Sequence, residues 1–111
     1  MTAQLALELS PLVTPDYEPD ATIQERFLAF HEANPAVLSS LESLTRQFLA
    51  SGRQRLAIGA LFERLRWEHD LRTTGDPFRL NNSFRSRYVR LMVDRNPDWA
   101  DVFATRCLTA P

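Results

Sequence analysis

The part of the sequence that decides the fold is residues 81–95, which read NNSFRSRYVRLMVDR. The first three residues are of types that cap the first turn of a helix, so we expect a helix over residues 83–95. Apolar residues then cover more than half of its circumference, which predicts that this helix lies at the centre of a hydrophobic core. They are Phe84, Tyr88, Val89, Leu91, Met92 and Val93. The polar residues form one narrow exposed strip of Ser83, Ser86, Arg87, Arg90 and Asp94.

A second helix is expected immediately upstream, over residues 58–71, and it is apolar on two sides. Its main apolar stripe consists of Ile58, Leu61, Phe62 and Leu65. A narrower strip on the far side consists of Ala60, Trp67 and Leu71. Because a helix that is apolar on two sides is expected to be covered on two sides, we predict that residues 72–80 fold over the second strip.

Further helices are expected before and after this pair. Residues 22–25, TIQE, form a capping-box pattern that starts a helix ending at Asn34. Asn34 and Pro35 are the expected N-cap and first turn of the next helix, which Gly52 ends. The Asn-Pro pair recurs at residues 96–97 and predicts a short last helix with Trp99 and Phe103 inward.

The helix expected between Pro35 and Gly52 is clearly amphipathic. One side carries the apolar residues Val37, Leu38, Leu41, Leu44, Phe48 and Leu49. The other side carries Ser39, Glu42, Ser43, Arg46 and Gln47. Together these patterns predict an all-α fold, a compact bundle of about five helices in a single domain over residues 22–108.

The first 21 residues differ from this domain. Pro11, Pro15 and Pro19 prevent a helix, and acidic residues lie between them. We expect an acidic, extended arm over residues 1–21 that makes only short apolar contacts and contributes little to folding. The leucines available for those contacts are Leu5, Leu7 and Leu12.

Composition and motifs favour a small intracellular protein without catalytic machinery. A single cysteine, Cys107, excludes an internal disulfide and a zinc cluster, and fits a reducing compartment. No signal peptide or membrane span is recognisable, so we expect a cytoplasmic protein that does not contact membranes. His31 and His69 each lack a second ligand at helical spacing, and the glycines are isolated. We therefore expect no metal, no cofactor and no enzymatic activity.

The two halves of the chain differ in charge. Residues 1–52 hold two arginines and seven acids, a net charge of −5, whereas residues 53–95 hold ten arginines and five acids, a net charge of +5. All 13 cationic side chains are arginine, so their placement is more informative than their identity. The predicted helices 58–71 and 83–95 and their connection therefore form a basic half.

A pair of helices with a capped second member resembles a helix-turn-helix, whose second helix enters the major groove of DNA. Residues suited to contact phosphates and base edges are Arg79, Asn81, Asn82, Arg85, Ser86, Arg87 and Arg90. Two features disagree with this interpretation. The connection over residues 72–81 is longer than the usual three or four residues, and an Arg90–Asp94 pair would explain the exposed strip without a ligand.

Several short motifs, spread over about residues 22–106, also resemble a family of small uncharacterised proteins of bacteriophages and prophages. They are Ile23-Gln24-Glu25-Arg26-Phe27, Phe30-His31, Asn34-Pro35, Leu61-Phe62-Glu63, Arg66-Trp67, Gly75-Asp76, Leu80-Asn81-Asn82-Ser83, Tyr88-Val89-Arg90-Leu91, Pro97-Asp98 and Phe103. The chain departs from the family pattern at Ala57, where a capping serine is expected. The resemblance implies a phage setting and brings no established activity.

Two hypotheses for function follow. The first is a phage-type accessory or regulatory protein that binds nucleic acid, with DNA as its partner, through the helix-turn-helix-like pair. The alternative is a protein-interaction module that binds and modulates a host or phage protein through the Trp67–Leu71 strip or the proline-rich arm. A continuous positive face on the two basic helices favours the first, whereas arginines paired with acids favour the second.

Overall fold

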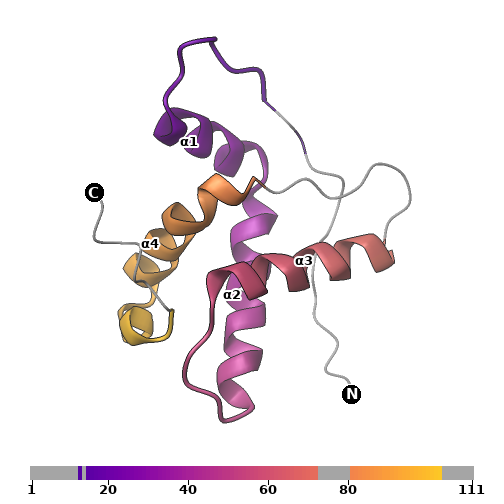
Figure 1. Ribbon diagram of the computed structural model, residues 1–111, viewed down its shortest axis with the longest axis vertical. Helices are drawn as coiled ribbons and strands as arrows, with labels where there is room; N and C mark the ends of the chain where they lie inside the picture. The colour runs from indigo at the N-terminus through magenta and orange to yellow at the C-terminus, as the bar shows by residue number, and fades with distance from the viewer. Residues whose placement is uncertain (1–12, 14, 73–80, 104–111) are drawn as a thin grey trace.

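The computed structural model describes residues 13, 15–72 and 81–103, apart from the side chains of residues 71 and 72. Within these residues the chain forms four α-helices and two short 3-10 helices. They are α1 (Ile23–Ala33), α2 (Pro35–Ala50), α3 (Ile58–Arg72), η1 (Asn82–Phe84), α4 (Arg85–Arg95) and η2 (Pro97–Asp101). Figure 1 shows α3 packed across α2, with α4 beside them and α1 at one end of α2. The predicted all-α class is confirmed.

The predicted number of about five helices is slightly off, because the expected last helix is a single 3-10 stretch. After Pro97–Asp101 the chain turns away to meet the segment before α3. The backbone N–H of Leu56 donates to the carbonyl of Val102 at 2.8 Å, and Leu56 and Phe103 form an isolated parallel bridge. The described chain therefore ends in a bridge to the segment before α3 and not in a further α-helix. The helix expected from residue 83 likewise begins with the 3-10 helix η1 before it becomes α4.

The helix ends lie where local chemistry predicts them. At the start of α1, the Thr22 hydroxyl accepts from the Glu25 N–H at 3.1 Å, and the Glu25 carboxylate accepts from the Thr22 N–H at 2.8 Å. The predicted capping box is therefore confirmed. After α2, Gly52 has a φ of +96°, a left-handed conformation in which the absence of a Cβ avoids strain.

Asn34 behaves differently from the prediction, because its side chain does not cap α2. Its Oδ1 accepts from the backbone N–H of Val13 at 2.7 Å, and its Nδ2 donates to the Val13 carbonyl at 2.7 Å. The same Nδ2 also donates to the carbonyl of Phe30 at 3.0 Å. This asparagine thus attaches residue 13 to the corner between α1 and α2. The contacts predicted for Leu5, Leu7 and Leu12 lie outside the described residues.

α3 and α4 pack against each other through the apolar stripes expected from the sequence, with one correction. Phe62, Leu65, Tyr88 and Met92 are fully buried, at 0% exposure. Leu91, which the sequence places among the apolar residues expected in the core, is only half-buried. The buried arc of α4 is narrower than its apolar pattern suggests, and Met92 lies at its middle while Leu91 lies at its edge.

The centre of the core is an aromatic cluster around Tyr88. Its ring lies edge-on to Phe27 of α1 at 4.8 Å and to Phe62 of α3 at 6.1 Å between ring centroids. Phe84 meets both Phe27 and Phe30 at 5.5 and 5.4 Å. Such tilted and edge-on pairs stabilise a core beyond their buried area. These aromatic rings are buried in the core and are therefore not available for stacking on nucleic-acid bases.

Candidate functional site

The predicted nucleic-acid-binding strip begins with two asparagines, and both have intramolecular partners. The Asn81 carboxamide oxygen accepts from the backbone N–H of Ser83 at 2.9 Å and from its hydroxyl at 2.7 Å, which makes Asn81 the N-cap of η1. The Asn82 carboxamide oxygen accepts from Arg66 of α3 at 2.7 Å. Arg79 lies outside the described residues, as does the connection that would have to form the turn.

Arg85, the next predicted contact residue, packs against α3. Its guanidinium carbon lies 5.9 Å from the centroid of the buried Phe62 ring. It also rests on Gly59, where an added Cβ would lie 3.3 Å from that carbon, tighter than ordinary contact. The side chain is half-buried, so it mainly covers the core between α3 and α4.

Of the other predicted residues, Arg87 connects α4 to α1. Its Nε donates to the side-chain oxygen of Gln24 at 2.9 Å. Ser86 is half-buried and Arg90 is exposed. The six described candidate residues therefore do not form one free surface, because Asn81 caps η1, Asn82 and Arg85 contact α3, and Arg87 contacts α1.

Arginine–carboxylate pairs reduce the positive charge of the basic half. Arg64 lies 3.1 Å from Glu68 along α3, and Arg66 pairs with Glu63 one turn before it. These i,i+4 and i,i+3 spacings are the ones expected to form pairs on a helix. At the end of α4, Arg95 lies 2.9 Å from Glu42 of α2. Three of the arginines of residues 53–95 are thus paired with glutamates, which lowers the positive charge that these helices present.

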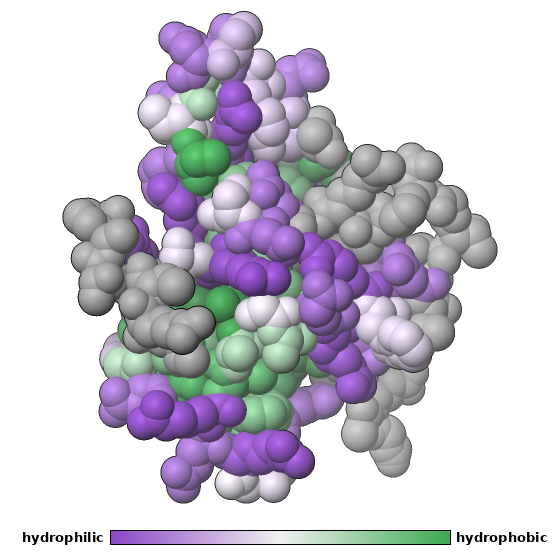
Figure 2. All heavy atoms as spheres, viewed as in Figure 1, coloured by the Kyte–Doolittle hydropathy of each residue, from purple (hydrophilic) through white to green (hydrophobic). Residues whose placement is uncertain are grey.

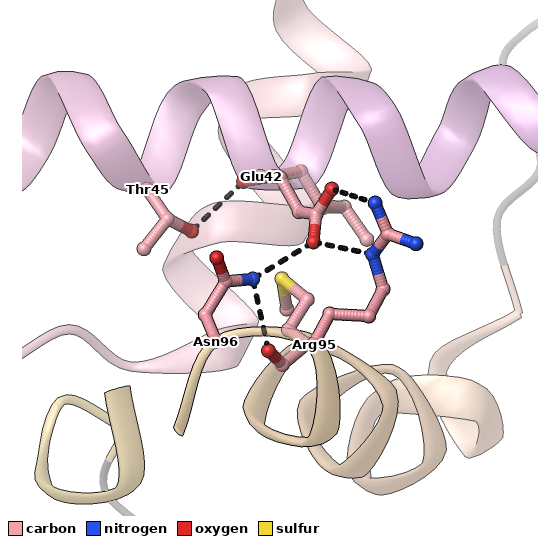
Figure 3. Close-up of polar contacts among 6 residues, drawn as sticks. Glu42, Thr45, Arg95 and Asn96 are labelled. Atoms are coloured by element: carbon pink, nitrogen blue, oxygen red, sulfur yellow. Dashed lines mark hydrogen bonds and ion pairs between the residues drawn. The ribbon is translucent and has the colours of Figure 1, made fainter. Parts of the chain in front are cut away.

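The α2–α4 junction is a second polar site where the structure differs from the prediction (Figure 3). Glu42, expected on the polar side of its helix, is buried at 4% exposure. Its carboxylate accepts from Arg95 Nε at 2.9 Å, from Arg95 Nη2 at 3.4 Å and from Asn96 Nδ2 at 2.9 Å. The Asn96 amide also donates to the Met92 carbonyl at 3.0 Å. A buried carboxylate needs such partners. These hydrogen bonds therefore serve to hold α2 against the end of α4.

Two titratable groups near the α2–α4 junction have shifted pKa values. The hydrogen bond from Arg95 to Glu42, together with the charge of Glu42, raises the pKa of Arg95. Burial, and secondarily the charge of Arg95, lowers the pKa of His31 below its usual value. The His31 ring stacks on Phe27 at 6.1 Å. The lowered pKa and the aromatic contact fit a histidine that serves packing here.

The outer side of α3 carries the most exposed aromatic side chain among the described residues. Trp67 is 64% exposed, whereas Phe62 and Leu65 on the opposite side of the same helix are fully buried. This confirms that α3 is apolar on two sides. The predicted cover, residues 72–80, lies outside the described side chains, so that prediction stays open.

A groove lies between α2 and the first half of α3. It has a volume of about 340 Å³, and its lining residues are Leu44, Gln47, Phe48, Leu56, Ala60, Leu61 and Arg64. Ala60, Arg64 and Trp67 follow one another at helical spacing, so the groove and the tryptophan share one side of α3. Figure 2 shows apolar side chains gathered in the lower half of its face, around the start of α3 and the neighbouring η2. We call the groove and Trp67 together the α2–α3 face.

The described residues offer little for catalysis. No group of three or more histidine, cysteine, aspartate or glutamate side chains lies together there in a way that can hold a metal ion. His69, at 3% exposure, lies inside the fold with its Nδ1 3.6 Å from the Asp70 carboxylate. No helix in the described part of the chain is long and apolar enough to cross a membrane.

Comparison with known proteins adds no family to this geometry: no family model, no curated protein and no solved structure matches the chain.

Proposed function

We propose that the chain is a protein-interaction module that binds its partner through the α2–α3 face. The observation that carries the proposal is Trp67, which is 64% exposed on a helix whose opposite side is fully buried. Tryptophan is enriched at the centres of protein interfaces, because it buries a large area at a low cost in side-chain entropy. In the phage setting implied by the family resemblance, the partner is a host or phage protein whose activity is modulated by binding.

The groove of the α2–α3 face supports the same function. Its lining is mainly leucine, phenylalanine and alanine, and its volume of about 340 Å³ can accept an apolar side chain of a partner. Arg64 stands at its edge with 60% of its side chain exposed while it pairs with Glu68. An apolar centre with a charged rim is the usual composition of a protein-binding surface.

Nucleic-acid binding is the second candidate, supported by the net charge of +5 over residues 53–95. Against it, Asn81, Asn82, Arg85 and Arg87 of the predicted strip are held by contacts within the fold. An arginine that already has a partner must give it up, or share it, to bind a phosphate. The geometry therefore supports protein binding better.

Capture from host lysate separates the two candidates. The wild-type chain, the Trp67→Ala variant and an Arg87→Ala/Arg90→Ala variant are each immobilised, and lysate is applied with and without nuclease. Binding through the α2–α3 face predicts that the wild type and the arginine variant capture the same protein after nuclease treatment, and that Trp67→Ala does not. Capture that disappears with nuclease, or with the two arginines, supports nucleic-acid binding instead.

A further inference from the structure

One exposed stripe on α1 is complementary to the α2–α3 face. Leu28 is 53% exposed, although a leucine in a helix is normally turned to the core. Glu25 lies three residues before it and Glu32 four residues after it, and both are exposed. These spacings place the three side chains on the same side of α1. The stripe thus presents one apolar side chain between two exposed carboxylates, of which that of Glu25 also accepts from the Thr22 N–H at the start of α1.

The α2–α3 face offers the opposite arrangement. Among the described residues that line the groove, the one charged side chain is Arg64. Arg53 lies beside it, with its guanidinium 5.9 Å from the ring centroid of Phe48 in the groove wall. Arg64 pairs with Glu68, but a guanidinium has five N–H donors and this one is still largely exposed. The groove therefore has an apolar floor and two arginines near its rim.

We propose that α1 of a second copy of this chain docks on the α2–α3 face, with Leu28 in the groove and Glu25 and Glu32 against Arg64 and Arg53. The proposal rests on the proposed function, because it names an occupant for the same face. The charges of the two halves agree with it, since residues 1–52 have a net charge of −5 and residues 53–95 one of +5.

The positions of the two surfaces require contact between different copies. α1 packs against α2, whereas the groove residues Leu44, Gln47 and Phe48 lie in the second half of α2 (Figure 1). The stripe points outward from α1, so a chain cannot fill its own groove with it. The contact is head-to-tail: each copy uses its α1 stripe toward one neighbour and its groove toward another. Such a contact also blocks the face for any other partner.

The contact is small, so the association is expected to be weak. One leucine and two ion pairs correspond to a dissociation constant of roughly 10 µM to 1 mM. Sedimentation of the full chain over a concentration series up to about 1 mM tests this. The average mass should rise above 12.8 kDa with concentration and should fall when salt is added.

Two variants disable one surface each. Leu28→Arg places a charge in the centre of the stripe, and Ala60→Arg places one in the groove. Each should weaken self-association at least about ten-fold, as expected for a central contact. Ala100→Arg adds the same charge at an exposed alanine outside both surfaces and should associate like the wild type. Circular dichroism confirms that each variant is folded.

Mixing the two disabled variants gives the sharpest result. Leu28→Arg retains its groove and Ala60→Arg retains its stripe, so the mixture should form a capped dimer of twice 12.8 kDa at concentrations at which either variant alone is mainly monomeric. A wild type that is monomeric at about 1 mM, or variants that associate like the wild type, overturn the proposal. If lysate capture still depends on Trp67 in that case, the proposed function stands without self-association. If the chain self-associates but Trp67→Ala captures the same protein as the wild type, self-association stands and the proposed function does not.

Discussion

The α2–α4 junction and the outer side of α3 place their side chains in opposite ways. At the junction, the charged Glu42 points inward and is 4% exposed, with Arg95 and Asn96 as its hydrogen-bond partners. On α3, the apolar Trp67 points outward and is 64% exposed. A charged side chain is normally exposed and a large apolar one is normally buried, so both residues depart from the usual pattern.

The difference lies in whether the fold compensates for the unfavourable placement. The buried carboxylate of Glu42 is compensated by three donor contacts from α4 and the residue after it, so it needs no ligand. Trp67 receives no comparable burial from the described residues. An exposed apolar side chain that the fold does not cover is therefore the better indication of function. Variants at the α2–α4 junction should lower stability, whereas variants on the outer side of α3 should lower binding.

The largest effect is expected on the buried side of α3. Phe62→Ala removes a fully buried ring that touches Tyr88, and should lower the free energy of unfolding by about 3–5 kcal/mol. Leu91→Ala should cost clearly less, because Leu91 is half-buried. Denaturant titration measures both. Equal losses for the two variants would mean that the buried arc of α4 is wrongly placed.

The next effect concerns two glutamate–arginine pairs that differ in burial. Glu42→Ala removes an acceptor shared by Arg95 and Asn96 and should cost about 1–3 kcal/mol. Glu63→Ala removes the exposed partner of Arg66 and should change stability by less than about 0.5 kcal/mol. Glu42→Gln, which retains an acceptor oxygen, should recover part of the loss. Similar losses at positions 42 and 63 would show that the junction does not join α2 to α4.

A smaller effect is expected from pH, through His31. Its pKa is lowered in the folded protein, chiefly by burial and also by the charge of Arg95, so the unfolded chain binds the proton more readily. The stabilising contribution is therefore complete above the unfolded pKa of about 6.5 and is lost as the pH falls below it. Denaturant titrations at pH 7.5 and 5.5 should show a smaller decrease for His31→Asn than for the wild type. An unchanged decrease would exclude His31 as its source.

The smallest effect on stability is expected for Trp67→Ala. The side chain is largely in water, so its removal should change the free energy of unfolding by less than about 0.5 kcal/mol. The same substitution should nevertheless abolish capture of the partner. A loss of several kcal/mol would instead mean that Trp67 is part of the core in solution.

Local signals in the sequence were sufficient for most of the helices. The capping box at Thr22 and Glu25 acts within one turn, and the prolines of the Asn-Pro pairs lie in the first turns of α2 and η2, so these signals can be recognised without knowledge of the fold. The stripe containing Phe62 and Leu65 is also a local, periodic signal. The two sides of α3 were predicted for the same reason.

Contacts between distant residues could not be predicted in this way. Glu42 lies among polar neighbours in α2, and its partners come 53 and 54 residues later. Asn34 was expected to cap α2, but it binds Val13, which is 21 residues away. The strip at Asn82, Arg85 and Arg87 was predicted from residue type alone, and residue type does not reveal that these side chains already have partners in α1 and α3. Charge counted along the chain therefore overstates the positive charge that a ligand meets.

The most direct test of the central claim follows the environment of Trp67 itself. The chain has two tryptophans, and Trp99 is buried, so a Trp99→Phe variant that remains folded reports on Trp67 alone. In the free protein its emission should be that of a water-exposed indole and should be quenched readily by acrylamide. Addition of the partner captured from nuclease-treated lysate should shift the emission to shorter wavelength and protect it from quenching. Binding of that partner without any change in emission or quenching would contradict the assignment of the α2–α3 face as the binding site.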